Sequence, residues 1–415
     1  MNEMQPLVGI DVGSSTVSVV VATPEDDQLV IHGCGQARHD GARKGVIAKL
    51  DEVTEAIRMA AEEAEAMSSM PVESSILGLG GAAIQGNPST ASVPATGRGD
   101  TVCHDDVGRA LRACAQVSIP PDYRVLDIIP CGFGIDGHDG MEHPVGMPGR
   151  RLDATAYVLY TNRIHAETVE QAVNRAAVAV EEMFFEPLAA AEAVLEDDER
   201  ELGCLLLDIG HASTEWVLFA ENAVLMSGGV PVGGRHFTSD LAAMLKTTTA
   251  AAEQIKRDVG CSLTREGLDE RAVEVPTLGG SGNQVHVASF VAEILVERAR
   301  DLFIGVHSAL MAHGLDRAPR AGIVLTGGGA MLEGLEDEAE AIFGHRVRTG
   351  FPRRLTGLTE PVSGPDWAVA CGLIRLRHRR RGQNLTATQH RGGLLARLRN
   401  ALGDFFELGG GNDRV

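Results

Sequence analysis

The sequence predicts a two-lobed α/β fold with an inserted α+β module and an amphipathic helix near the C-terminal end. A short pattern occurs twice, 197 residues apart: an apolar strand, an Asp-x-Gly turn at Asp11 or Asp208, and a second apolar strand. A third glycine turn at 326–329 follows the apolar strand 322–325. Self-similarity of this kind is typical of a duplicated α/β unit, with one copy in each lobe.

The composition limits the classes of protein that the chain can be. Its 415 residues are 44% hydrophobic and 23% charged, which is too apolar for a disordered chain and too long for one simple core. The formal net charge of −20 argues against a nucleic-acid partner, because binding to phosphates needs a basic surface. The longest apolar runs stay well short of the roughly 18 residues that a membrane-spanning helix needs. We therefore expect several packed units and no nucleic acid.

The elements follow in order from apolar periodicity and turn residues. Alanine-rich and amphipathic spacing predicts helices over 51–67, 105–116 and 166–180, and a mostly helical region over 236–319. Residues 84–162 contain seven prolines, glycine turns and the short strands 124–129 and 154–160, which predicts a small inserted α+β module. Residues 377–393 are basic and polar without an apolar period, and this favours a flexible linker.

The repeated turns have a composition that suits a phosphate group and its metal. One Asp-x-Gly turn is most often an ordinary hairpin. Two in register, with a third glycine turn, favour a nucleotide site, because strand-end carboxylates can hold a hydrated Mg²⁺ while backbone N–H and hydroxyl groups bind phosphate oxygens. The residues in these roles are Asp11, Asp208, Gly13, Gly210, Thr16 and Ser213.

Longer motifs carry a resemblance to a known family. Those at 9–16, 186–191, 206–210 and 321–328 resemble the phosphate, connecting and adenosine motifs of the actin, Hsp70 and hexokinase superfamily. Those at 119–121, 124–130, 143–147, 252–256 and 273–276 resemble, within it, the bacterial FtsA family of actin-like cell-division proteins. The resemblance covers nearly the whole chain and implies an actin-like fold. The implied parts are subdomain 1A at 1–83 and 163–203, subdomain 1C at 84–162, subdomain 2A at 204–235 and 320–376, subdomain 2B at 236–319, the linker 377–393 and a membrane-targeting helix at 394–408.

The resemblance also implies ATP and Mg²⁺ in the cleft. Asp11 and Asp208 would orient the hydrated metal, and Glu186 matches the superfamily position that orients the attacking water. The implied phosphate contacts are Gly13, Ser14, Ser15, Thr16, Gly210 and Ser213, and the implied ribose and adenine contacts are Gly233, Gly234, Glu253, Lys256, Gly327 and Gly328.

The second phosphate loop departs from the family pattern. It has His211 and Ala212 where the family usually has two glycines. A non-glycine residue forced to positive φ would cost about 1–2 kcal/mol. We therefore expect ATP binding with at most weak ATPase activity.

The segment 394–406 is predicted to be an amphipathic helix. At 100° per residue its apolar side chains fall within an arc of about 140°. They are Leu394, Leu395, Leu398, Ala401, Leu402, Phe405 and Phe406, with Arg397 and Arg399 at the flanks. Apolar insertion with flanking arginines is typical of binding to anionic lipids. Docking of this helix on the protein's own body is the alternative, and the polar stretch before it favours the membrane.

The resemblance implies a function in cell division. A family member would tether the tubulin-like protein FtsZ to the cytoplasmic face of the inner membrane at the septum, polymerise in an actin-like manner, and recruit later division proteins through subdomain 1C. Arg298 matches the region that binds the FtsZ C-terminal tail. The alternatives are a sugar kinase or Hsp70-type ATPase with the same cleft, or a PilM-like pilus-assembly adaptor. No motif resembles the substrate-side base of a sugar kinase, and PilM lacks a C-terminal lipid helix of this kind.

Overall fold

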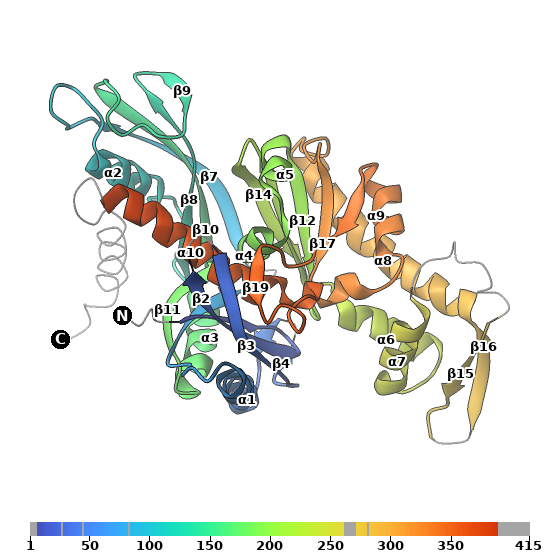
Figure 1. The fold of residues 1–415 in the computed structure, drawn as a ribbon. Coiled ribbons are helices and arrows are strands. Elements are labelled where there is room, and N and C mark those ends of the chain that lie inside the picture. The colour runs from blue at the N-terminus through green and yellow to red at the C-terminus, as the bar shows by residue number, and fades with distance from the viewer. Residues whose placement is uncertain are drawn as a thin grey trace, which may run out of the picture. The chain divides into compact units, whose positions relative to one another are not determined.

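The computed structural model describes residues 6–25, 28–43, 45–81, 84–260, 271–279 and 282–388. These residues form two compact units, and Figure 1 shows their elements. Unit 1 comprises the described residues up to 86, together with 121–126 and 160–375. Unit 2 comprises 87–120, 127–159 and the described residues from 376 onward.

The first half of unit 1 is built on a six-stranded sheet with the order β11-β6-β1-β2-β3-β19. Its strands are β1 (Leu7–Val12), β2 (Thr16–Glu25), β3 (Gln28–Arg38), β6 (Ser74–Leu79), β11 (Ala179–Phe185) and β19 (Leu355–Gly357). β1 and β2 form an antiparallel hairpin in which Asp11 lies opposite Ser18, and β6 runs parallel to β1. The short strands β4 (Ala42–Arg43) and β5 (Val46–Ile47) pair with each other in a separate two-stranded sheet.

The second half repeats this arrangement in a five-stranded sheet with the order β14-β13-β12-β17-β18. Its strands are β12 (Cys204–Ile209), β13 (Thr214–Ala220), β14 (Ala223–Val230), β17 (Gly322–Thr326) and β18 (Val347–Thr349). β12 and β13 form the antiparallel hairpin with Asp208 opposite Glu215, and β17 runs parallel to β12. The duplicated α/β architecture predicted from the two Asp-x-Gly turns is therefore confirmed.

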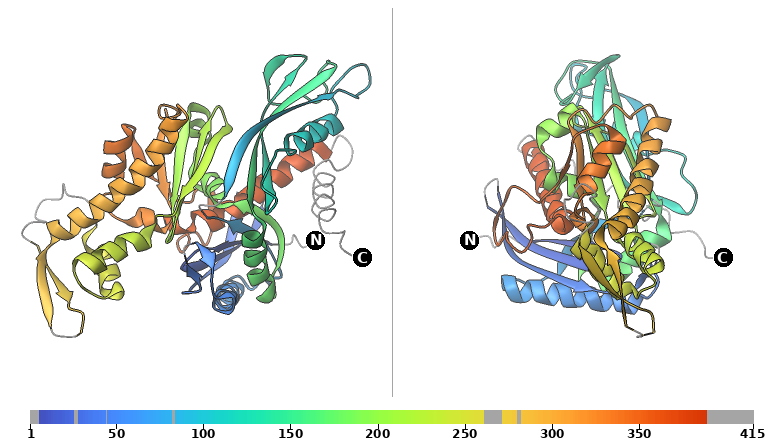
Figure 2. Two further views of the ribbon diagram at one scale, coloured as in Figure 1. Left: turned by 180° about the vertical axis from the view of Figure 1, so that it is seen from behind. Right: turned by 90° about the vertical axis from the view of Figure 1, so that its right-hand side faces the viewer.

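Helices pack on both sheets. In the first half these are α1 (Leu50–Ser68) and α3 (Arg163–Arg175). α4 (Glu186–Val194) contacts strands of both sheets, and the short α5 (Asp197–Leu202) contacts β13 of the second. α1 packs on β3 at very close range, because a Cβ on Gly35 would lie only 2.0 Å from the carbonyl oxygen of Ala60. Figure 2 shows α1 running along this sheet. The helix predicted over 166–180 ends at Arg175, since Ala177 adopts φ 66° and the chain turns into β11.

The region 236–319 is mostly helical, as its composition predicted. It contains α6 (Gly234–Met244), α7 (Thr249–Val259), the hairpin β15 (Ala272–Pro276) with β16 (Asn283–Val287), and α8 (Ala288–Ala312). α8 contributes ten buried residues to one core with the second sheet and α9 (Leu335–Phe343). In the second sheet Trp216 is 2% exposed and packs over Gly228, where a Cβ would come within 2.4 Å of the indole ring. A second tryptophan, Trp367, lies in the 3₁₀ turn Pro365–Trp367 and is 8% exposed.

Unit 2 contains the inserted module. Its four-stranded sheet has the order β7-β10-β8-β9, and one helix, α2 (His104–Cys114), packs with it around Leu111, Phe133 and Leu152. The strands are β7 (Gln85–Pro94), β8 (Tyr123–Ile135), β9 (His138–Met141) and β10 (Arg151–Asn162). The strands predicted at 124–129 and 154–160 lie within β8 and β10.

The linker predicted over 377–393 is wrong in its first part. The chain is helical through Thr388, in α10 (Ala368–Thr388). Two causes outweigh the lack of an apolar period: arginine is a good helix former, and Arg380 pairs with Asp127 of β8 at 2.6 Å. The amphipathic helix predicted at 394–408, and the last residues of the predicted linker, lie outside the described residues. Among the described helices, none combines the length and the hydropathy needed to cross a membrane.

Candidate functional site

A cavity of about 680 Å³ lies in unit 1, and residues of both duplicated halves line it. This volume is within the usual range for small-molecule sites. The structure brings nearly all of the predicted site residues to its wall: Asp11, Gly13, Ser14, Ser15, Thr16, Glu186, Asp208, Gly210, Ser213, Gly234, Glu253, Lys256, Gly327 and Gly328. Gly233 and Arg298 are not part of the wall.

The two hairpin turns have the same internal geometry. The N–H of Gly13 donates to the carbonyl of Thr16 at 3.0 Å, and the N–H of Gly210 donates to that of Ser213 at 2.9 Å. An added Cβ would lie 2.9 Å from the Thr16 oxygen at Gly13 and 3.1 Å from the Ser213 oxygen at Gly210. Glycine is therefore favoured at both positions by the tightness of the turn, more strongly at Gly13, and not by positive φ.

The strain that we expected at His211 and Ala212 is absent. Neither residue is among those with positive φ, so each side chain is carried without a backbone penalty. Ala212 is buried, and His211 is exposed and lines the cavity. Backbone strain therefore gives no reason to expect weak hydrolysis. The reason that remains is the space that these two side chains occupy.

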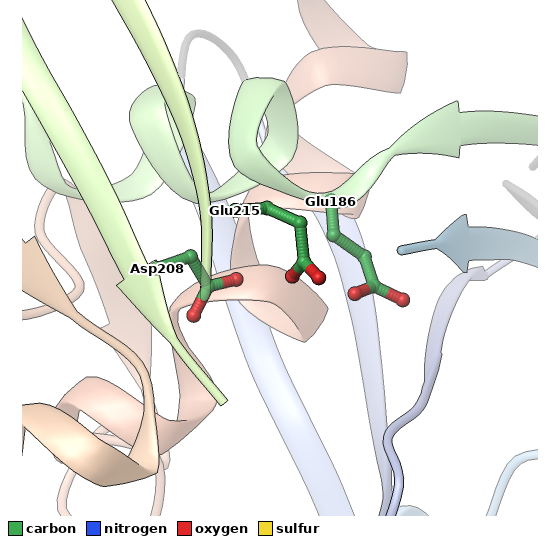
Figure 3. A group of neighbouring side chains, drawn as sticks. All are labelled: Glu186, Asp208 and Glu215. Carbon is green, nitrogen blue, oxygen red and sulfur yellow. The ribbon is translucent and has the colours of Figure 1, made fainter. Parts of the chain in front are cut away.

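Three carboxylates gather at the cavity (Figure 3). Oxygens of Glu186, Asp208 and Glu215 all lie within 4.8 Å of one another. Each comes from a different element: Asp208 from the end of β12, Glu215 from the start of β13 opposite it, and Glu186 from the first turn of α4. Asp11, which we paired with Asp208 as the metal-orienting residue, does not lie within that distance of all three.

Glu215 was missed in the sequence, although a signal was present. It follows Asp208 by seven residues, the spacing that separates Asp11 from Ser18 in the first hairpin. In both hairpins these two positions face each other across the strands. The second copy therefore has a carboxylate where the first has a hydroxyl, and this difference places the acidic cluster in the second half.

Four of the carboxyl groups at the cavity have raised pKa values. Burial raises the pKa of Asp208 to about 7, and burial together with Asp208 raises the pKa of Glu215 to about 7. Burial and the neighbouring carboxylates raise the pKa of Asp11 to about 8 and hold that of Glu186 well above its usual range. A bound cation would relieve this repulsion, and a set of carboxylate oxygens fits Mg²⁺, a hard cation that prefers oxygen ligands.

A cation and an anion are fixed together on another part of the wall. Lys256 donates to Oε2 of Glu253 at 2.7 Å and to the carbonyl of Gly234 at 3.1 Å, and Thr238 donates to Glu253 at 2.6 Å. Burial alone would raise the pKa of Glu253, but these hydrogen bonds outweigh burial and lower it to about 2. The Glu253 carboxylate is therefore charged, and both side chains are held in place, as a polar ligand group requires.

The remaining glycines allow close packing. A Cβ on Gly233 would lie 2.5 Å from the carbonyl oxygen of Gly210, so this residue holds α6 against the second hairpin although it does not face the cavity. Gly327 adopts φ 81°, and a Cβ there would lie 2.2 Å from Oδ1 of Asp208. The third glycine turn can therefore lie directly against the acidic cluster.

Arg298 lies on α8, away from the cavity. Its Nε pairs with Asp240 at 2.5 Å and its Nη1 with Asp301 at 3.4 Å, and its side chain is 26% exposed. The guanidinium group predicted to meet a partner thus already has partners within the protein.

The duplicated halves, with turns and acids gathered on one cavity, define the actin-like class of proteins. Solved structures with this fold include the PilM-PilN type IV pilus biogenesis complex (TM-score 0.64, 18% identity, covering 89% of this chain and 98% of that one). Another is MreB 5 of Spiroplasma citri bound to AMPPNP (TM-score 0.57, 12% identity, covering 93% and 99%). The predicted actin-like fold is confirmed.

Sequence relatives identify the family. The family model for the cell division protein FtsA matches residues 205–372, and that for the SHS2 domain inserted in FtsA matches residues 81–160. The cell division protein FtsA of Pseudomonas aeruginosa is 34% identical over 89% of this chain and 88% of its own length. That of Neisseria meningitidis serogroup B is 32% identical over 98% of this chain and its full length. The chain belongs to the FtsA family of cell division proteins, as the sequence motifs indicated.

Proposed function

We propose that this FtsA-family protein binds ATP with Mg²⁺ in its cavity and links FtsZ to the membrane at the division septum. One observation carries the nucleotide part of the proposal. Both Asp-x-Gly hairpins and the third glycine turn meet at one cavity, which is large enough for a nucleotide and is lined by buried carboxylates. The structure of MreB 5 from Spiroplasma citri, which shares this fold, has AMPPNP bound, and this supports the same use of the fold here.

The residues at the wall have separate tasks in this proposal. Backbone N–H groups and the hydroxyls of Thr16 and Ser213 bind phosphate oxygens, and the Glu253–Lys256 pair binds the ribose or the base. Mg²⁺, held by Asp208 and Glu215 with Asp11 nearby, would neutralise phosphate charge. Glu186 would orient a water molecule toward the terminal phosphate. Weak hydrolysis is expected from the side chains of His211 and Ala212, which occupy space near the second turn.

Titration calorimetry of ATP binding, with Mg²⁺ and with EDTA, tests the site. We expect Mg²⁺ to tighten binding to the wild type, and we expect Asp208→Asn to remove most of this dependence. Lys256→Ala should weaken binding in both conditions, because its contact is not to the metal. Asp198→Asn, on the exposed surface of α5, is the matched control. Equal ATP affinity in all variants and both conditions would exclude a nucleotide site in this cavity.

Membrane attachment rests on family membership and on the apolar arc of 394–406. Burial of even a few leucine and phenylalanine side chains contributes roughly 1.5–3 kcal/mol each, enough to offset the cost of folding a short helix. Co-sedimentation with anionic vesicles should therefore retain the full chain and lose a chain that ends at Arg391. Leu398→Glu should release the protein, whereas Asn400→Glu on the polar face should weaken binding only slightly. Equal release by both changes would show simple charge attraction and not insertion.

The proposal that Arg298 of α8 binds the FtsZ tail can be tested through the ion pair between Arg298 and Asp240. An acidic FtsZ tail would have to compete with Asp240 for this guanidinium group. Asp240→Ala should therefore tighten binding of an FtsZ C-terminal peptide, and Arg298→Glu should weaken it. Arg300→Glu, about 200° further around the helix, is the control. Unchanged peptide affinity in the first two variants would locate the tail elsewhere.

Self-association and recruitment complete the proposal. We infer an actin-like polymer of this chain at the cytoplasmic face of the inner membrane, with later division proteins recruited through the module in unit 2. Family membership supports both points.

A further inference from the structure

The turns of the two Asp-x-Gly hairpins, which we call the phosphate hairpins, accept hydrogen bonds from different groups. In the second hairpin, the carbonyl of Gly210 accepts from the N–H of Gly234 and that of His211 from the N–H of Arg235, both at 2.9 Å. These donors are the first two residues of α6. At the first hairpin, within the part of the chain that the structure describes, His39 supplies two donors instead.

His39 contacts the first hairpin through its backbone and its side chain. Its Nε2 lies 3.0 Å from the carbonyl oxygen of Gly13, and its backbone N–H donates to the carbonyl of Ser15 at 3.0 Å. Gly13 and Gly210 hold the same place in the repeat. The imidazole group therefore does in the first half what a backbone N–H of α6 does in the second.

The hydrogen bonds also determine the tautomer of the ring. The N–H of Gly41 donates to Nδ1 at 3.2 Å, so Nδ1 is the unprotonated nitrogen and Nε2 carries the hydrogen. The ring is neutral and donates to Gly13. It is 8% exposed, and burial lowers its pKa against the opposing effects of the Gly13 hydrogen bond, Asp40 and Glu52.

Gly41, which donates to the other ring nitrogen of His39, is itself held against α1. The carbonyl of Gly41 accepts from the N–H groups of Ala48 and Lys49, at 2.8 and 2.9 Å, where α1 begins. A Cβ on Gly41 would come within 2.6 Å of Val53 on α1, so the backbone here packs directly on the helix. His39 thus connects the turn of the first hairpin to a fixed point at the start of α1.

We propose that His39 is a positioning residue for the first phosphate hairpin. It does not line the cavity and acts through the carbonyl of Gly13, which sets the direction of the turn and of its N–H groups. This inference rests on the proposed binding of ATP. It deepens that proposal, because it assigns the orientation of one phosphate-binding turn to a side chain 26 residues away in the sequence.

Two amide variants separate the two hydrogen bonds of the ring. In His39→Gln the amide NH₂ reaches the position of Nε2 and can donate to Gly13. In His39→Asn the amide oxygen takes the position of Nδ1 and can accept from Gly41, but no donor reaches Gly13. We expect MgATP affinity within about threefold of wild type for Gln and about tenfold weaker for Asn, because the Asn variant leaves the part-buried carbonyl of Gly13 without the donor that orients it.

Two further measurements distinguish positioning from general stability. Adenosine affinity should be unchanged in both variants, since the adenosine contacts lie in the other half of unit 1. In the protein without nucleotide, hydrogen exchange of residues 13–16 should be faster in His39→Asn than in His39→Gln or the wild type. If the wild type binds no MgATP, the proposed function fails, and hydrogen exchange still decides the role of His39.

The proposal is overturned by either of two results. One is that His39→Asn matches the wild type in MgATP affinity and in exchange at 13–16. The other is that Asn and Gln are equally impaired, including for adenosine, which would show that His39 supports the fold in general and does not orient this turn.

Discussion

Asp106 in unit 2 and Asp208 in unit 1 are both buried aspartates, 0% and 5% exposed, in opposite electrostatic settings. Asp106, in the first turn of α2, accepts from Thr96 through both its hydroxyl and its N–H, from the N–H of Cys103, and from Arg109. Burial would raise the pKa of Asp106, but these hydrogen bonds outweigh burial and hold the pKa well below its usual range. Asp208 lies beside two other carboxylates, and burial raises its pKa to about 7.

The difference separates a structural acid from one that needs a ligand. A buried carboxylate with four donors is stable as an anion and ties together the segments that supply those donors. A buried carboxylate among other carboxylates is unfavourable as an anion until a cation arrives. Strongly raised pKa values of this kind are typical of functional sites, and the comparison can be tested at both positions.

The largest effect is expected when Asp106 is removed. Asp106→Ala leaves three part-buried donors and the Arg109 guanidinium group without the acceptor that they share, so we expect a loss of about 3 kcal/mol in the free energy of unfolding of the module. Urea unfolding followed by far-UV circular dichroism, with hydrogen exchange to locate the loss in residues 87–120, measures it. Asp105→Ala is the control, because that side chain is 69% exposed. Equal stability of the two variants would contradict a structural role for Asp106.

A substitution at the cavity is expected to raise the stability of the metal-free protein. Asp208→Asn removes a buried negative charge from the cluster, so the metal-free protein should gain roughly 1–2 kcal/mol of stability at pH 8. The variant should lose the further stabilisation that Mg²⁺ gives to the wild type. Thermal unfolding in EDTA and in Mg²⁺ measures both quantities. A less stable metal-free variant would show that Asp208 has a structural role like that of Asp106.

The pH dependence should differ between the two units. Asp106 has a lowered pKa in the folded state, so its contribution is present above the ordinary value of about 3.9 and is lost as the pH falls below it. Asp208 and Glu215 have raised pKa values of about 7, so their protonation favours the folded state at low pH, and this advantage is lost as the pH rises from their ordinary values through about 7. In EDTA, the unfolding temperature of unit 1 should therefore fall between pH 5 and pH 8, and Mg²⁺ should restore more of it at pH 8. A metal-free unit 1 that becomes more stable over this interval would contradict the raised values.

The smallest effect is expected at the partner of Asp106. The Arg109 side chain is 31% exposed, so solvent screens part of its ion pair with Asp106. Arg109→Ala should cost about 1 kcal/mol or less, and the difference from wild type should shrink in high salt. A loss as large as that of Asp106→Ala would mean that the ion pair, and not the backbone donors, stabilises this carboxylate.

The sequence predicted the parts of the site that repeat, because a repeat can be recognised by comparing two segments of the sequence without knowing which residues are in contact. The turns at Asp11 and Asp208, with their glycines, were found in this way. Glu215 is not part of the repeated pattern, because the first copy has Ser18 at the corresponding position, seven residues after its aspartate. His39 could not be found, because its role depends on contacts with Gly13 and Gly41 that no local pattern encodes.

The same limit explains the error at the predicted linker. Residues from 377 onward lack an apolar period, and from the sequence alone a polar arginine-rich stretch indicates a flexible segment. The ion pair between Arg380 and Asp127 joins residues 253 apart, and such a contact becomes visible only in the fold. The positions of His211 and Ala212 outside the left-handed region were equally inaccessible, since φ depends on the turn as a whole.

The two tryptophans of the chain give the cavity a built-in fluorescent reporter. Trp216 directly follows Glu215 of the acidic cluster, and Trp367 directly follows Asp366 at the cavity wall. Both belong to unit 1, so intrinsic tryptophan emission reports on that unit. Nucleotide or metal binding can therefore be followed in the unlabelled protein, and comparison of emission with circular dichroism separates the unfolding of one unit from that of the other.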